Sequence, residues 1–176
     1  MQFHPTSLRD AVLIELDPAR DKRGFFARSF CVEEFAAHGL ETNYPQHSIS
    51  GSPRRGTLRG MHYQRDPHGE VKLVRCTRGS ILDVIIDIRA DSPTFRRWQA
   101  FELSPINGRQ LYIPKGFAHG FQTLSDDSEV SYLISEPYRP ESACGIRYDA
   151  PSFEISWPLS VTEISEQDLF WPDFLK

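Results

Sequence analysis

Short hydrophobic runs, many of them rich in β-branched residues, alternate with glycine, proline and aspartate breaks through the middle of the chain. The clearest run covers residues 81–88, where only Asp83 and Asp87 interrupt isoleucine, leucine and valine. Similar patterns predict strands at residues 72–76, 99–103, 110–113, 117–124 and 129–134. Strands spaced by roughly 8–12 residues, with turn residues between them, are typical of a β-sandwich or barrel.

The remaining pattern adds one helix and no second domain. Residues 32–38 predict a short helix with Phe35 on its apolar side and Gly39 as its stop signal. Residues 157–176 are rich in aromatic residues and proline, so we expect them to pack back onto the barrel. With 176 residues and no repeat or linker, the chain is expected to form a single all-β domain, 1–176.

The composition argues against a membrane, secreted or nucleic-acid-binding protein. No stretch reaches the ~18 apolar residues of a membrane span, and the N-terminus lacks the pattern of a signal peptide. The three cysteines are odd in number and widely spaced, which indicates a reducing cytoplasm rather than a disulfide framework. The net charge of −4 gives no support to a nucleic-acid partner. We therefore expect a cytoplasmic protein that binds neither membrane nor nucleic acid.

The first candidate site is the segment GTLRGMHYQ, residues 56–64. Arg59 and His62 are three residues apart in sequence that suits a strand, so they point to opposite faces unless Gly60 forms a bulge. A lone histidine in such a segment is more often structural than catalytic, and the case for His62 depends on its neighbours.

The second candidate is a spaced set of turn residues that ends in a histidine. Gly108 is followed after five residues by Pro114-x-Gly116 and then by His119. This spacing resembles the second motif of the cupin barrels, in which the histidine often binds a metal. Thr123 occupies the position where that motif usually has asparagine.

The matching first cupin motif would need His-x-His, but the chain has His62-Tyr63-Gln64. The remaining ligands would be His62, His119 and Glu70, and Gln64 is a weak ligand for a transition metal. We therefore expect no metal. The spacing of Gly108, Pro114, Gly116 and His119 still predicts a cupin barrel. A barrel histidine without a metal suits proton chemistry, because imidazole titrates near ~6.5.

Removing a proton next to a ketone also requires a group that stabilises the enolate oxygen. Lys72 could supply it, and Tyr132 could return a proton from the opposite face. Each residue has a plain alternative: Lys72 as a solvated strand lysine, and Tyr132 as a core or rim aromatic.

Arginines concentrate in the first third of this acidic chain, at Arg20, Arg23, Arg28, Arg54, Arg55 and Arg59. Arginine binds phosphates bidentately, so the cluster suggests a diphosphate ligand. Solvated surface charge is the alternative and is the better interpretation for Arg20 and for one of Arg54 and Arg55.

Several segments together resemble one enzyme family, in the family's order: DKRGFF, GTLRGMHYQ, KLVRCTRGSILDVIIDIRADSPTF, LYIPKGFAHGFQTLSD, WP and ISEQD. The chain is similar over nearly its whole length to the dTDP-4-dehydrorhamnose 3,5-epimerases and their relatives. The resemblance implies a cupin-type double-stranded β-helix, a jelly-roll barrel, that forms a homodimer without metal or organic cofactor. It implies a nucleoside-diphosphate 4-keto-6-deoxyhexose as substrate, most often dTDP-linked, epimerised at C3 and C5 or at one of them.

The resemblance also implies residue roles. His62 matches the base, Asp168 the carboxylate that orients it, Lys72 the lysine that steadies the enolate, and Tyr132 the acid. Among the binding residues, His119 matches a pocket histidine, Arg23 and Arg59 match diphosphate contacts, and Tyr138 matches an aromatic near the nucleotide base. Arg23 is expected to reach in from the partner subunit.

The chain departs from the family pattern at two residues and in the length of one segment, the one before GTLRG, which is one residue longer than in the rhamnose enzymes. Arg28 stands where the family commonly has glutamate near the nucleotide. The segment before GTLRG, expected to be a loop, usually reads Gln-x-Asn-x-Ser; here Gln46 and Ser50 match and Ser48 replaces the asparagine. These changes leave the nucleotide base and the reaction at C5 open.

Three alternatives remain. A 3-epimerase or 3,4-ketoisomerase would use the same barrel. A metal-dependent cupin oxygenase or isomerase would need the ligands discussed above. A non-catalytic cupin would bind the sugar without proton exchange.

Overall fold

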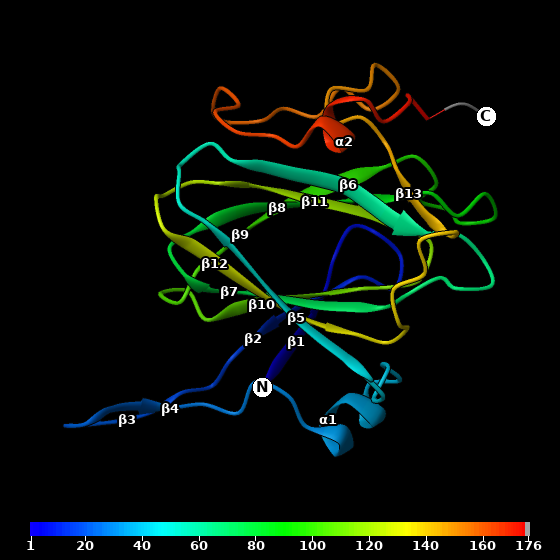
Figure 1. The fold of residues 1–176 in the computed structure, drawn as a ribbon. Coiled ribbons are helices and arrows are strands. Elements are labelled where there is room, and N and C mark those ends of the chain that lie inside the picture. Colours follow the sequence, from blue (N-terminus) through cyan, green and yellow to red (C-terminus); the bar gives the residue numbers. More distant parts are fainter. Residues whose placement is uncertain (175–176) are drawn as a thin grey trace.

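The computed structural model describes residues 1–174, which form two facing antiparallel sheets (Figure 1). The six-stranded sheet contains, in spatial order, β1 (Gln2–Pro5), β2 (Val12–Glu15), β10 (Arg109–Ile113), β7 (Lys72–Arg78), β12 (Ser128–Ile134) and β5 (Gln46–Ser52). The five-stranded sheet contains β13 (Ala143–Gly145), β6 (Leu58–Gln64), β11 (Phe117–Thr123), β8 (Ile81–Asp87) and β9 (Trp98–Leu103). The last two residues of the predicted domain 1–176 lie outside the described residues.

The main core lies between the two sheets. Val74, Leu111 and Val130 from the six-stranded sheet pack with Ile85 and Phe121 from the five-stranded sheet. Side chains alternate along each strand, so every second residue faces this interior. At one end of the space between the sheets, polar side chains such as His62, Lys72 and His119 take the place of apolar ones and line a cavity.

Each sheet is also covered on its outer face. Residues 146–174, which include α2 (Glu166–Leu169), cover the five-stranded sheet and bury Met61, Val84 and Ile86 (Figure 1). On the other side, α1 (Val32–Ala37) places Phe35 against Leu73. The expectation that the C-terminal segment packs onto the barrel is confirmed for its described part.

A two-stranded hairpin, β3 (Ala19–Asp21) and β4 (Gly24–Phe26), projects from the barrel (Figure 1). Its phenylalanines Phe25 and Phe26 are exposed, Phe26 to 79%. Two adjacent large apolar side chains are thus left in water on this hairpin, where they form an exposed apolar patch.

All the predicted strands are present, with ends that differ by one or two residues, and the predicted helix is α1. The expectation of a loop before GTLRG is wrong, because residues 46–52 form β5, paired along β12. This strand turns Gln46, Ser48 and Ser50 to the interior and leaves Ile49 exposed, so it has no hydrophobic alternation. Among the described residues, no helix is long and apolar enough to cross a membrane.

Candidate active site

A bulge in β6 places Arg59 and His62 on the same face. His119 pairs with His62 and Phe121 pairs with Arg59, so one residue of β11 between these pairs opposes two residues of β6. Gly60 has a φ of 139°, and a Cβ there would collide with Gly120 of β11. Only glycine allows this close approach with a positive φ, and the extra residue turns Arg59 to the interior beside His62.

His62 is paired with a carboxylate from the far end of the chain. His62 Nε2 lies 2.6 Å from Asp168 Oδ1, and the two residues are 106 positions apart. The imidazole is 45% exposed and the carboxylate 7%. Ser165 caps α2 and accepts from the Asp168 backbone N–H, which fixes the turn that presents the carboxylate. Asp168 thus reaches His62 from the segment covering the sheet.

Two opposing effects act on the pKa of Asp168. Burial raises the pKa of this carboxyl, but hydrogen bonds from His62, Gly60 N and Trp171 outweigh burial and keep the pKa below its usual range. Asp168 therefore stays ionised at neutral pH and presents a fixed negative charge to the imidazole.

A second histidine–aspartate pair lies deeper in the barrel. His119 Nε2 donates to Asp83 Oδ2 at 2.9 Å, and both side chains are buried. Asp83 is one of the two aspartates that interrupt the hydrophobic run of β8. In a strand buried on both faces, this polar residue is explained by its partner on the neighbouring strand β11.

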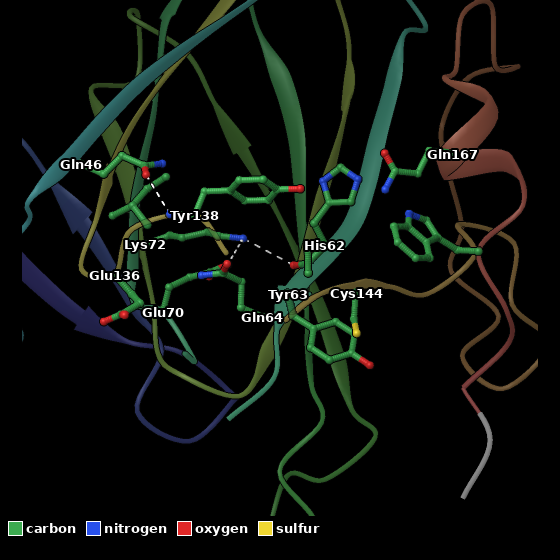
Figure 2. Close-up of a pocket in the computed structure, with 13 residues that line it drawn as sticks. Gln46, His62, Tyr63, Gln64, Glu70, Lys72, Glu136, Tyr138, Cys144 and Gln167 are labelled. Atoms are coloured by element: carbon green, nitrogen blue, oxygen red, sulfur yellow. Dashed lines mark hydrogen bonds and ion pairs between the residues drawn. The ribbon is translucent and has the colours of Figure 1, made fainter. Parts of the chain in front are cut away.

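Lys72 contributes a cation at the side of the cavity formed by β7 (Figure 2). Its Nζ lies 2.9 Å from Glu70 Oε1 and donates to the backbone oxygen of His62 at 3.4 Å. Both charged side chains are mostly buried and border the cavity. The pair fixes the ammonium group next to the strand that carries His62.

Tyr132 enters the cavity from β12. Its hydroxyl lies 3.0 Å from Ser50 Oγ, and its ring meets the His119 ring edge-on at a centroid distance of 6.3 Å. Burial raises the pKa of the Tyr132 phenol well above its usual value. The phenol therefore keeps its proton at neutral pH.

Two adjoining cavities, of about 260 and about 230 Å³, share His62, Lys72 and Ile134 in their walls. The inner cavity is also bordered by Ser48, Arg59, His119 and Tyr132. The outer one is bordered by Gln46, Gln64, Tyr138, Gln167 and Trp171. In Figure 2 the Tyr138 hydroxyl and the Gln167 carboxamide point toward the His62 ring. All four residues predicted for the chemistry therefore lie at one place.

Two predicted binding residues lie apart from these cavities. Arg23 is on the projecting hairpin, where it pairs with Asp21. Arg28 pairs with Glu34 of α1 at 2.8 Å. Within one chain, neither borders the space around His62, whereas Arg59 borders it and donates to Ser52 Oγ and to the Gly51 carbonyl.

Gln64 occupies the position of the second metal histidine in the cupin pattern, and its side chain bonds to the backbone of neighbouring loops. Its amide nitrogen donates to the His68 carbonyl, and its oxygen accepts from Arg139 N at 2.6 Å. Gln46 Oε1 accepts from Tyr138 N at 2.9 Å in the same region. The two glutamines thus hold the loop that carries Tyr138.

Some residues of the candidate site are not predicted from the sequence, because contacts with residues far away in the chain bring them there. Short sequence motifs do not mark Asp83, Gln167 or Trp171, and they suggest Glu70 only as a metal ligand. Glu70 instead pairs with Lys72. Over residues 1–174, no group of three or more His, Cys, Asp or Glu side chains is arranged to hold a metal ion. For Glu70, its position two residues before Lys72 was the available signal.

Comparisons with known proteins agree with this geometry. A family model described as dTDP-4-dehydrorhamnose 3,5-epimerase matches residues 5–176. The dTDP-4-dehydrorhamnose 3,5-epimerase of Methanothermobacter thermautotrophicus is 44% identical over 174 residues, which are 97% of this chain and 92% of the relative.

Solved structures agree as well. The dTDP-4-dehydrorhamnose 3,5-epimerase of Bacillus anthracis, with TDP and PPi bound, superposes with a TM-score of 0.96 at 37% identity, covering 98% of this chain and 99% of the other. ChmJ, a 3'-monoepimerase from Streptomyces bikiniensis in complex with dTDP-quinovose, gives a TM-score of 0.90 at 33% identity, covering 97% and 86%.

The fold and the site define a cupin-type jelly-roll enzyme of the isomerase class. The chain belongs to the dTDP-4-dehydrorhamnose 3,5-epimerase family. The family resemblance and the jelly-roll fold expected from the sequence are confirmed.

Proposed function

We propose that this enzyme epimerises a nucleoside-diphosphate 4-keto-6-deoxyhexose at C3 and C5, with dTDP as the favoured nucleotide. The observation that carries the proposal is that His62, Lys72 and Tyr132 border one cavity and that Asp168 is bonded to His62. A base, its carboxylate, a cation and a phenol are the groups that an enolate route needs.

In the first step, His62 removes a proton from the carbon next to the C4 ketone. With Nε2 turned to Asp168, Nδ1 is the nitrogen left to accept the proton. The C–H bond breaks and its electron pair moves onto the carbonyl oxygen, where the Lys72 ammonium stabilises the enolate. Asp168 stabilises the imidazolium that forms.

In the second step, Tyr132 delivers a proton to the opposite face of the carbon. His62 belongs to the five-stranded sheet and Tyr132 to the six-stranded sheet, so a sugar ring between them has one residue on each side. The enolate electron pair forms the new C–H bond, and the carbonyl returns. Solvent then restores the phenol proton and takes the proton held by His62, which leaves no net change in composition.

The binding residues implied by the family resemblance fit the same proposal. We propose that Gln46, Ser48, His119 and Arg59 contact the sugar and the diphosphate, because their side chains face the cavities. The exposed ring of Tyr138 suits a place near the nucleotide base.

We further propose that the enzyme is a homodimer and works in the cytoplasm. The exposed phenylalanines of the hairpin favour contact with a second copy, to whose cavity Arg23 would bring a diphosphate ligand. Arg28 would lie near the nucleotide in the same arrangement. The three cysteines are unpaired, which agrees with a reducing compartment.

Solvent deuterium exchange tests the reaction. Incubation of the enzyme in D2O with a dTDP-linked 4-keto-6-deoxyhexose should label both C3 and C5, as measured by mass spectrometry and NMR. The variant Tyr132→Phe should still exchange the proton at C3 but form much less inverted product. No label at either carbon would contradict the enolate mechanism.

Reaction at C3 alone is the second candidate. Ser48 in place of the family's asparagine favours it, because a shorter side chain contacts the sugar differently, and a 3'-monoepimerase is among the similar structures. Label at C3 without label at C5 would select this candidate.

A further inference from the structure

Trp171 contacts the carboxylate that is paired with His62. Its indole Nε1–H donates to Asp168 Oδ1 at 3.2 Å, and this is the oxygen that accepts from His62 Nε2 at 2.6 Å. The other oxygen accepts from Gly60 N at 3.2 Å. Asp168 therefore has three N–H donors, and the indole shares one oxygen with the imidazole.

A glycine makes room for this indole. Gly145 of β13 is the strand partner of His62, and a Cβ at Gly145 would overlap the five-membered ring of Trp171. Arg147 N donates to the Pro172 carbonyl at 3.0 Å, which fixes the backbone next to Trp171. The ring is thus held against β13, where it also forms part of the cavity wall beside His62.

We propose that Trp171 is a positioning residue for the reaction: its indole N–H orients Asp168 and limits the basicity of that carboxylate toward His62. The proposal rests on the proposed function only in taking His62 as the base. A carboxylate oxygen shared between two donors attracts the imidazolium proton less strongly than one with a single donor. The indole N–H therefore holds the Asp168 carboxylate in place and weakens its attraction for a proton on His62.

Other charged and titratable groups border the cavities around the pair. From β6 and β7 and the segment between them come Arg59, Tyr63, Glu70 and Lys72. From β11, β12 and the loop after it come His119, Tyr132, Glu136 and Tyr138, while Cys144 and Glu163 lie on β13 and before α2. All of these groups are unchanged by a substitution at Trp171, so they form a constant background.

The test compares two tryptophans that each donate one hydrogen bond. Trp171→Phe keeps a ring in the wall and removes the N–H. The matched control is Trp157→Phe, which removes an indole bond to the Tyr148 carbonyl away from the cavity. For Trp171→Phe we expect the acid limb of the kcat/KM profile to move up by roughly 0.3–0.5 pH unit, as the loss of one neutral hydrogen bond allows. We also expect kcat near neutral pH to fall about three- to ten-fold with little change in KM. Trp157→Phe should show neither effect.

Two further measurements complete the test. Gly145→Ala should displace the indole and move the acid limb in the same direction. NMR titration of the His62 ring in the ligand-free enzyme should show the same upward movement of its midpoint for Trp171→Phe. This readout needs no substrate, so it is independent of the deuterium-exchange result that would overturn the proposed function. Identical pH profiles and His62 titrations for Trp171→Phe and Trp157→Phe would overturn the role of Trp171.

Discussion

The barrel contains two histidine–aspartate pairs that differ mainly in their access to solvent. His62 and His119 are partners on neighbouring strands, and each has an aspartate within 2.6 or 2.9 Å. The His62 side chain is 45% exposed, whereas that of His119 is 5% exposed. The same chemical pair thus occurs once with an exposed histidine and once with a buried histidine that borders the inner cavity.

This difference decides what each pair can do. A histidine that exchanges protons with substrate and solvent must have one nitrogen accessible, and His62 satisfies this with Nδ1. His119 is held by a fully buried carboxylate, and it borders the inner cavity beside Tyr132. It is suited to bind the sugar and to fix the phenol ring. Pairing with a carboxylate is therefore a weaker sign of a catalytic base than pairing combined with exposure.

The largest expected effect comes from removing the imidazoles. His62→Ala should lower kcat by ~10²–10⁴-fold, because a positioned general base contributes that much, and it should change the melting temperature little. His119→Ala should lower kcat far less and reduce stability more, because it leaves a buried carboxylate without its donor. Steady-state kinetics and thermal unfolding of both variants check this. Equal losses of kcat in the two variants would remove the distinction between the pairs.

The carboxylates give the next test of the comparison. Asp168→Asn should lower kcat by roughly 10²–10³-fold, since the imidazolium loses its fixed negative charge. Asp83→Asn should lower kcat less than about ten-fold, yet destabilise the protein by ~1–3 kcal/mol, because a new amide N–H is buried without a partner. Kinetics with urea unfolding measures both quantities. The comparison fails if Asp83→Asn is the more damaging variant for kcat.

Sequence patterns predicted the strands that carry hydrophobic runs, including the edge strand β9, and missed polar or very short ones for a physical reason. Strand β8 is buried on both faces and reads as a continuous hydrophobic run, which is easy to find. Strand β5 lies at the sheet edge, with serines inside and Ile49 exposed, so its hydrogen bonds to β12 rather than its side chains define it. The short edge strand β13 also lacks a hydrophobic pattern. Its Gly145 is explained by contact with Trp171 and not by strand propensity.

The site was predictable where motifs are local. His62, Lys72 and His119 follow from short motifs and from the family resemblance, and Asp168 from the resemblance alone. The sequence indicates that Arg59 and His62 share a face only if Gly60 forms a bulge. Whether the bulge forms depends on how β6 pairs with β11, which the sequence of β6 alone does not determine. The contact of Trp171 with Asp168 had no local signal, since it depends on how the C-terminal segment packs over Gly145.

The smallest expected effect is the pH dependence of stability that the Asp168 carboxylate confers. The folded-state pKa of Asp168 lies below its unfolded value because of the hydrogen bonds from His62, Gly60 and Trp171, although burial opposes them. Such a group contributes stability above the unfolded pKa of ~3.9, and this contribution is lost as pH falls through the lowered folded pKa. The difference in unfolding free energy between the wild type and Asp168→Asn should therefore shrink as pH falls from about 5 to below about 4.

Urea unfolding of both proteins at pH 7, 5, 4 and 3.5 measures this difference, with circular dichroism confirming that each is folded at the start. Because the expected change is of order 1 kcal/mol, the midpoints should be compared at a common slope. A difference that stays constant down to pH 3.5 would show that Asp168 is not held ionised by its three donors. In that case the carboxylate would act on His62 through shape alone, and the contrast between the exposed and buried pairs would lose its electrostatic basis.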